Sequence, residues 1–127
     1  MWETTKRWAR AYGLDPALLG AVVWVESRYC PKAVGSVGEV GLGQVRPKTA
    51  EWLGIPSDYL WHPEWNLVAT ARYLRYLYGR YGDWRKAIAA YNAGPSKVDS
   101  GYIPPSTQIY VQAVLTTYDY MKRRYPR

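Results

Sequence analysis

The sequence predicts a mainly or wholly α-helical fold. Three observations support this expectation: apolar residues recur at helical spacing, strand-like alternation is scarce, and proline or glycine stands at most expected helix ends. The chain has 127 residues, of which 48% are hydrophobic, and it shows no internal repeat or linker. This length and composition predict one globular domain over residues 1–127 with one core.

The first part of the chain predicts two helices. The first covers residues 2–12 and ends at Gly13. Asp15 followed by Pro16 is typical of a helix start, because aspartate caps free amide groups and proline suits the first turn. The second helix covers residues 16–28. One of its faces carries Leu19, Val22, Val23 and Glu26 at positions i, i+3, i+4 and i+7.

Turn and cap residues define the remaining elements. Glycines at positions 35, 38, 41 and 43 predict a loop with close backbone approaches. A short helix is expected over residues 47–53, before Gly54. Longer helices are expected over residues 63–78, over 84–93 after the capping Asp83, and over 107–122. Residues 96–105 contain two consecutive prolines and are expected to form a loop.

Charge and rare residues narrow the function classes. The formal net charge of +7 favours polyanionic partners such as nucleic acid, anionic lipid or cell wall. The basic residues are scattered and form no stripe interleaved with aromatic residues, so no nucleic-acid module is expected. The only cysteine, Cys30, and the only histidine, His62, exclude an internal disulfide bond and a zinc site built from several such ligands. No metal or other cofactor is expected, and the Trp-His-Pro context of His62 does not suit a Ser-His-Asp triad.

The first residues lack the apolar stretch of a signal peptide, and no run reaches membrane-spanning length. We therefore expect a monomer without stable membrane insertion. It would be made in the cytoplasm, exported by another route, or be a domain excised from a longer protein.

Glu26 stands where the apolar face of its helix predicts a core residue. Burial of an unpaired carboxyl group raises its proton affinity, and a carboxylic acid protonated near neutral pH can donate a proton to a glycosidic oxygen. The alternative is a glutamate at the helix end that turns to water or pairs with Arg28. Periodicity alone favours this alternative.

Two further segments carry polar groups in unusual settings. The glycine loop brings Gln44, whose amide both donates and accepts hydrogen bonds, into a place where a ligand can lie against the backbone. It lacks the Lys-Ser/Thr ending of a phosphate-binding loop. The small residues of Ala90-Tyr91-Asn92-Ala93-Gly94 would let Tyr91 and Asn92 reach a polar centre, although such a segment taken alone is more often ordinary helix packing.

Together these segments resemble a known family. The set Glu26-Ser27, Gly38-x-x-Gly41-Leu42-x-Gln44 and Ala90-Tyr91-Asn92-Ala93-Gly94, in this order and spacing, is similar to the soluble lytic transglycosylase domain of glycoside hydrolase family 23. Two further motifs also resemble the family, Pro63-x-x-Asn66-Leu67 leading to Tyr73-Leu74, and Thr107-x-x-Tyr110-Val111. The resemblance extends from about Trp8 to Tyr120.

The resemblance implies a lysozyme-like helical fold with a groove for peptidoglycan glycan strands. It implies cleavage of the β-1,4 bond between N-acetylmuramic acid and N-acetylglucosamine with formation of a 1,6-anhydro ring. The small size, the positive charge and the lack of a signal peptide suit a phage lysis protein that acts on the cell wall, and equally a domain cut from a virion-associated or secretion-system protein. Glu26 would be the single acid and base. Gln44 would hold the sugar, Tyr91 and Asn92 would fix the Glu26 carboxyl and the substrate, and Tyr73 would line the cleft. Ser36, Glu39 and Tyr110 are the further candidates for substrate binding.

The chain departs from the family pattern at four positions. Gly35 stands where a serine is common, with Ser36 one step later; Glu39 replaces a small residue, Gly43 a methionine, and Ser106 a glutamate. We expect Glu39 to point to solvent. In the cleft it would make hydrolysis of the same bond plausible, so a muramidase stays an alternative, as does a non-catalytic wall-binding module. One or two of Trp24, Trp52, Trp61 and Trp65 are expected to stack on sugars.

Overall fold

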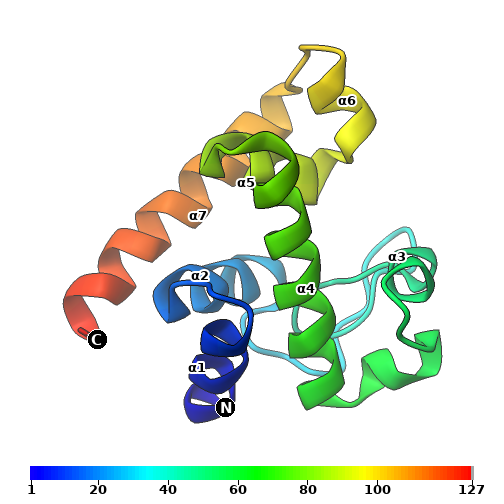
Figure 1. The fold of residues 1–127 in the computed structure, drawn as a ribbon, viewed down its shortest axis with the longest axis vertical. Coiled ribbons are helices and arrows are strands. Elements are labelled where there is room, and N and C mark those ends of the chain that lie inside the picture. The colour runs from blue at the N-terminus through cyan, green and yellow to red at the C-terminus, as the bar shows by residue number, and fades with distance from the viewer. Residues whose placement is uncertain (127) are drawn as a thin grey trace.

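The computed structural model describes residues 1–126 and confirms the predicted all-helical fold (Figure 1). The elements are α1 (Trp2–Ala11), α2 (Pro16–Ser27), α3 (Pro47–Trp52), the 3₁₀ helix η1 (Ser57–Trp61), α4 (Pro63–Tyr81), α5 (Trp84–Ala93), α6 (Pro95–Asp99) and α7 (Pro105–Arg124). Within the described residues, β-type pairing is limited to two isolated bridges, which join Val34 to Val40 and Val40 to Val45.

The helix starts follow from local capping. The Asp15 side chain accepts a hydrogen bond from the amide of Ala17 at 3.0 Å, as expected for a cap followed by proline. The Asp83 side chain accepts one from the amide of Lys86 at 3.1 Å. Arg28 ends α2 in the left-handed conformation, with φ 55°, and Gly82 ends α4 in the same way, with φ 65°.

Two elements differ from the sequence prediction. Residues 96–99, expected to lie in a loop, belong to the short helix α6 (Pro95–Asp99), because Pro95 follows Gly94 and occupies the first helical position. The prediction treated Gly94-Pro95 only as a stop signal. The 3₁₀ helix Ser57–Trp61 was not predicted. It begins directly after Pro56, a residue that can end one helix or precede another. Elsewhere the helix ends lie within three residues of those expected.

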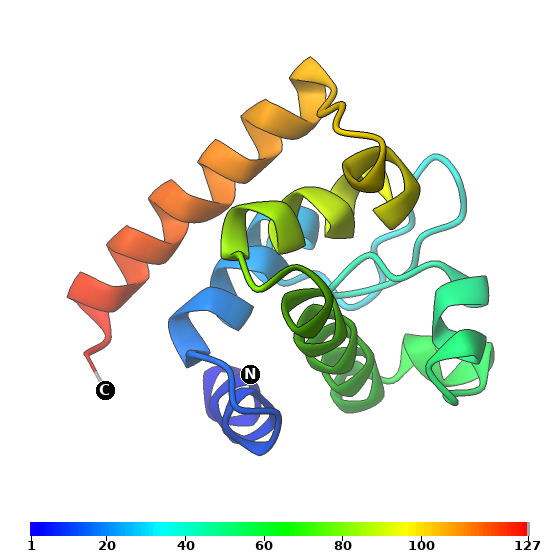
Figure 2. The ribbon, with the colours of Figure 1, turned by 45° about the horizontal axis from the view of Figure 1, so that its top comes forward.

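The main core lies where α2, α4, α5 and α7 meet. Figure 2 shows α5 between α4 and α7, and the packing of α5 on both agrees. Leu19, Leu74, Leu77, Ile88 and Val114 are fully buried there. A second apolar cluster joins Val40 and Val45, from the segment of the glycine loop, to Ile55 and Leu60. Both clusters reach the site described next, since Val45 belongs to the second and Tyr73 and Tyr91 pack against the first.

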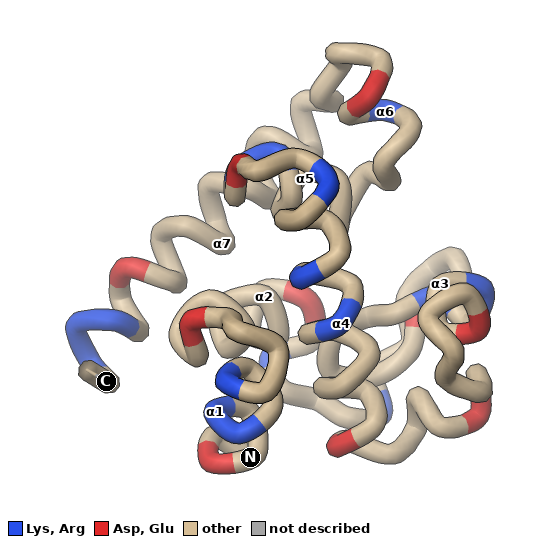
Figure 3. The backbone as a smooth tube through the Cα atoms, viewed as in Figure 1, with Lys and Arg blue, Asp and Glu red and all other residues tan. Residues whose placement is uncertain are grey.

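Charged residues are spread over the surface, with a basic group of Lys122, Arg123 and Arg124 at the end of α7 (Figure 3). No described helix has both the length and the apolar composition needed to cross a membrane.

Candidate active site

A cavity of about 240 Å³ lies where the end of α2, the glycine loop, α4 and α5 converge. Its walls are formed by Glu26, Glu39, Gln44, Val45, Arg46, Thr49, Tyr73, Tyr91, Asn92, Ala93, Gly94 and Pro95. Six of the residues singled out from the sequence therefore share one cavity, although up to 66 positions separate them along the chain. Ser36 is exposed on the loop and does not line the cavity. Tyr110 lies behind the wall, against Glu26.

Glu26 occupies the last turn of α2, and the helix end is fixed to the glycine loop. The buried Ser27 hydroxyl donates to the carbonyl of Leu42 at 2.7 Å, which joins the two elements beside the carboxyl group. The guanidinium group of Arg28 lies over the ring of Trp24, 4.9 Å from its centroid, and forms no ion pair with Glu26. The expected alternative of an ion pair between Glu26 and Arg28 is therefore wrong.

Burial raises the pKa of Glu26 to about 7. A hydrogen bond from the Tyr110 hydroxyl to Glu26 Oε2, at 2.7 Å, acts in the opposite direction because it stabilises the carboxylate. The negative charge of Glu39 adds to the upward shift. Glu26 is thus balanced between its acid and carboxylate forms near neutral pH, which is the condition for a group that first donates and then accepts a proton.

The residues from α5 do not hold the Glu26 carboxyl in the way expected. The Tyr91 hydroxyl donates to the carbonyl of Gly43 at 2.6 Å and so fixes the glycine loop. Asn92 Oδ1 accepts from the hydroxyl of Thr107 at 2.7 Å, which ties α5 to α7. The expectation that Tyr91 and Asn92 fix the carboxyl is therefore corrected: Tyr110, on the buried face of α7, takes that position.

Gln44 is held in a left-handed backbone conformation, with φ 51°. Its side-chain nitrogen donates to the carbonyls of Ala33 and Gly41, at 3.1 and 3.0 Å. The loop therefore uses the donor side of the amide, and the side chain lines the cavity in a fixed orientation.

Asn66 on α4 organises the loop from below, a role that the sequence analysis missed. The residue is fully buried. Its Oδ1 accepts from the amide of Gly43 at 2.8 Å, and its Nδ2 donates to the carbonyls of Val40 and Leu60, at 2.8 and 3.0 Å. The Pro63-x-x-Asn66-Leu67 motif was the available signal, since a buried asparagine at a helix start needs several backbone partners.

Glu39 lines the cavity and is only partly exposed, so the expectation that it points to solvent is wrong. Its Oε1 accepts a hydrogen bond from the amide of Val37 at 3.0 Å, which folds the side chain back over its own loop. Two carboxyl groups, Glu26 and Glu39, therefore share the cavity, with Arg46 as the cationic residue on its wall.

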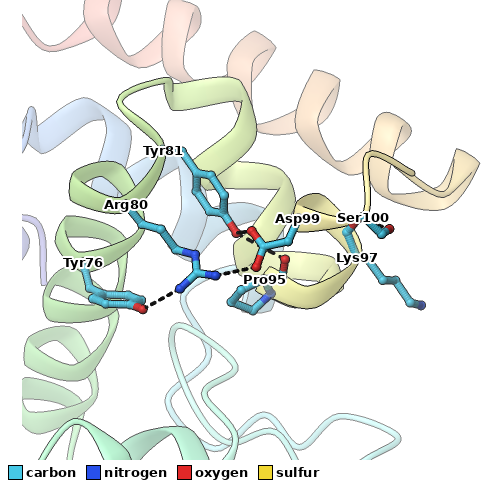
Figure 4. A network of polar contacts seen from close by, with 7 residues as sticks. All are labelled: Tyr76, Arg80, Tyr81, Pro95, Lys97, Asp99 and Ser100. Carbon is cyan, nitrogen blue, oxygen red and sulfur yellow. Dashed lines mark hydrogen bonds and ion pairs between the residues drawn. The ribbon is translucent and has the colours of Figure 1, made fainter.

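A polar network fixes the wall formed by α6 (Figure 4). The guanidinium group of Arg80 donates to the Tyr76 hydroxyl at 3.1 Å and forms an ion pair with Asp99. The Tyr81 hydroxyl donates to Asp99 Oδ1 at 2.9 Å and lies 3.2 Å from the carbonyl of Pro95. These contacts hold α6, and with it the Pro95 wall, against the end of α4.

An aromatic recess adjoins the cavity through shared walls at Thr49, Tyr73 and Pro95. Its volume is about 240 Å³, and its remaining walls are Lys48, Trp52 and Tyr76. The rings of Trp52 and Tyr76 meet edge to face with centroids 4.7 Å apart. Of the tryptophans considered from the sequence, Trp52 lies beside the site. Trp24 borders a separate groove near Trp2 and Tyr125, and Trp65 packs against Tyr59.

Comparison with known proteins shows which family the chain resembles. Residues 3–102 match the family model "Transglycosylase SLT domain". The chain is 38% identical over 100 residues to the transglycosylase of Enterobacteria phage PRD1, covering 79% of this chain and 37% of the phage protein. It is 33% identical over 125 residues to peptidoglycan transglycosylase gp16 of Escherichia phage T7, covering 94% of this chain and 9% of that protein.

A solved structure shares the fold. The 70-kDa soluble lytic transglycosylase of Escherichia coli superimposes with a TM-score of 0.87 and 29% identity, over 98% of this chain and 24% of that one. The chain thus spans well under half the length of each of these proteins. Nevertheless, the family model covers most of its residues, and the chain belongs to the transglycosylase SLT domain family.

Proposed function

We propose that this chain is a peptidoglycan lytic transglycosylase of the glycoside hydrolase family 23 type. It would cleave the β-1,4 bond between N-acetylmuramic acid and N-acetylglucosamine and leave 1,6-anhydromuramic ends. The observation that carries the proposal is one partly buried glutamate, with a pKa raised to about 7 and a hydrogen bond from Tyr110, in a cavity shared with Gln44 and an aromatic recess. The whole of residues 1–127 would act as one monomeric catalytic domain on the cell wall, as a phage lysin or as part of a larger wall-acting protein.

The chemistry uses both protonation states of Glu26. The protonated acid gives its proton to the glycosidic oxygen while the bond from C1 to that oxygen breaks. The C6 hydroxyl of the muramic residue then attacks C1, and the Glu26 carboxylate takes the hydroxyl proton. Burial favours the acid that starts the reaction, and the Tyr110 hydroxyl stabilises the carboxylate that exists halfway. Glu26 returns to its acid form, and no water is consumed.

The surroundings suit a neutral polymer of amino sugars. Gln44 and Asn92 offer polar atoms on the cavity wall, and sugar hydroxyl and acetamido groups can both donate and accept hydrogen bonds. The exposed faces of Trp52 and Tyr76 continue the surface beyond the catalytic cavity. Aromatic rings with a polar edge suit the faces of sugar rings, so the glycan would extend along this recess.

A second candidate function is hydrolysis of the same bond, and Glu39 is the observation that favours it. Hydrolytic glycosidases use a second carboxylate to activate water or to form a covalent intermediate. Glu39 brings a second carboxyl group to the cavity. Its hydrogen bond from the Val37 amide and its place on the glycine loop do not by themselves align a water molecule at C1, so transglycosylation is the primary proposal.

Product analysis tests both functions. Purified sacculi are digested with the wild-type chain, with Glu26→Gln, and with Glu3→Gln as a control at an exposed site. Mass spectrometry should show anhydro-ended muropeptides from the wild type and the control, and none from Glu26→Gln. Reducing-ended products would replace the proposal with a muramidase. Pelleting with the wall without any product would identify a binding module.

A further inference from the structure

We propose that Glu39 is a second substrate-contacting carboxylate of the cleft, and that residue 35 is a glycine because a side chain there would displace it. The inference rests on the proposed function, since it assigns a role within the same cleft. It concerns a pair of positions at which the chain departs from the pattern of the family that it resembles.

The space around Gly35 supports the pairing. A Cβ atom at residue 35 would lie 2.6 Å from Cδ of Glu39 and 2.8 Å from Oε1 of Gln44. Real Cβ atoms do not approach so closely, so both the Glu39 carboxyl and the Gln44 amide oxygen would have to move. The φ angle of Gly35 is not positive, unlike those of Gly38 and Gly41. The backbone conformation at residue 35 therefore does not require glycine, but the positions of the Glu39 carboxyl and the Gln44 amide do.

The loop itself is built to hold the carboxyl group. The amide of Gly35 donates to the carbonyl of Glu39 at 2.8 Å, and the amide of Gly38 donates to the carbonyl of Gly35 at 3.1 Å, so the chain turns tightly between them. The amide of Val37 holds Oε1 of Glu39. A carboxylate has about four acceptor positions, and this loop contact uses one of them. The others are available to hydroxyl or N–H donors of a bound saccharide.

Glu39 also affects the pKa of Glu26. The groups that face Glu26 are Tyr110 from α7, Tyr91 from α5, Tyr73 from α4, and Glu39 and Arg46 from the loop side. Among them, Tyr110 lowers and Glu39 raises the pKa of Glu26. Removal of the Glu39 charge should lower the pKa of Glu26, and the alkaline limb of activity should move to lower pH. A residue with a merely structural role would not move this limb.

The test is a double-mutant cycle on Gly35→Ala and Glu39→Ala, with Glu39→Gln as the charge-only variant. We expect Glu39→Ala to raise KM for solubilised glycan strands about threefold or more and to shift the alkaline limb downward. Gly35→Ala should do the same, because it pushes the carboxyl out of place. The double variant should lose less than the sum of the two single losses, because Glu39→Ala removes the closest contacts of the new methyl group and leaves only the one with Gln44 Oε1. Glu39→Gln should shift the limb while keeping more of the affinity.

Binding measured without turnover separates this inference from the proposed function. In the Glu26→Gln background, affinity for N-acetylglucosamine oligomers is measured by calorimetry with and without Glu39→Ala, and thermal unfolding checks that each variant is folded. Weaker binding without the Glu39 carboxyl supports the inference even if the wild type yields no anhydro product. Equal binding and an unmoved pH limb in folded Glu39→Ala would overturn it. Additive losses from Gly35→Ala and Glu39→Ala would overturn the pairing.

Discussion

The hydroxyl group of Tyr110 donates a hydrogen bond to Oε2 of Glu26 across the interface between α7 and α2, at 2.7 Å. The two residues are 84 positions apart, and α2 and α7 form the most extensive helix contact of the described chain. The pKa of Glu26 therefore depends on how the last helix packs.

Tyr110→Phe should reduce activity and shift its pH dependence upward. The hydrogen bond lowers the pKa of Glu26, so its loss should raise that pKa further and move the alkaline limb to higher pH. A hydrogen bond to a charged group contributes about 1.5–3 kcal/mol, so a loss of roughly tenfold or more in kcat is expected. The pH–rate profile on solubilised glycan strands measures both effects.

Tyr91→Phe is the matched control for that experiment. Its hydroxyl binds the carbonyl of Gly43, not the carboxyl group, so its loss should loosen the loop and lower activity with the alkaline limb in place. A pH shift in Tyr91→Phe equal to that in Tyr110→Phe would contradict the separate roles given to these tyrosines.

Glu26→Gln should stabilise the protein at alkaline pH while it removes activity. The folded state holds the Glu26 proton up to about pH 7, whereas a free glutamate loses it near 4.5. Wild-type stability should therefore fall as pH rises between these values, because the unfolded chain releases the proton first. The full cost, up to about 3 kcal/mol, is present above pH 7. Thermal unfolding at pH 4.5 and pH 8 should show a gain for Glu26→Gln only at the higher pH; an equal gain at both would contradict the raised pKa.

Asn66→Ala should destabilise the whole domain. The buried side chain satisfies the amide of Gly43 and the carbonyls of Val40 and Leu60, and its removal leaves these groups without their partner in the interior. A cost of about 2–4 kcal/mol is expected. Chemical denaturation measures it, with Gln112→Ala on the exposed side of α7 as the control. A change below about 1 kcal/mol would mean that water replaces the amide without loss.

Trp52→Ala should weaken glycan binding with little effect on the chemical step. Trp52 borders the aromatic recess next to the cavity, whereas Trp61 is similarly exposed on η1 and borders neither. KM on long glycan strands should rise several-fold for Trp52→Ala and stay near the wild-type value for Trp61→Ala. If both variants behave alike, the recess does not contact the substrate.

The sequence predicts the helices and the buried position of Glu26, because both depend on local rules. Asp15-Pro16 and Asp83 identify helix starts, and the apolar spacing around Glu26 places a carboxyl group where a core residue is expected. The raised pKa of Glu26 follows from that burial. The short helix after Gly94 was missed because a glycine-proline pair can end one helix and begin another, and only tertiary contacts such as those of Asp99 decide.

The hydrogen bonds around Glu26 depend on long-range packing and could not be predicted from residue patterns. Tyr91 and Tyr110 both lie in recognisable motifs, and only the crossing of α5 and α7 over α2 determines which hydroxyl reaches the carboxyl group. The orientation of Glu39 depends on an empty volume at Gly35, and sequence patterns do not report volumes. The central role of Asn66 depends on three backbone groups, two from the glycine loop and one from η1.

The two long walls of the cleft are held by bonds of different kinds. The glycine-loop wall is anchored by the buried amide of Asn66, whereas the Pro95 wall is held by the solvent-exposed Arg80–Asp99 pair. Dissolved ions screen exposed charge pairs far more than buried hydrogen bonds. The wall formed by α6 should therefore loosen as ionic strength rises while the glycine-loop wall stays rigid, and the cleft should widen on the α6 side.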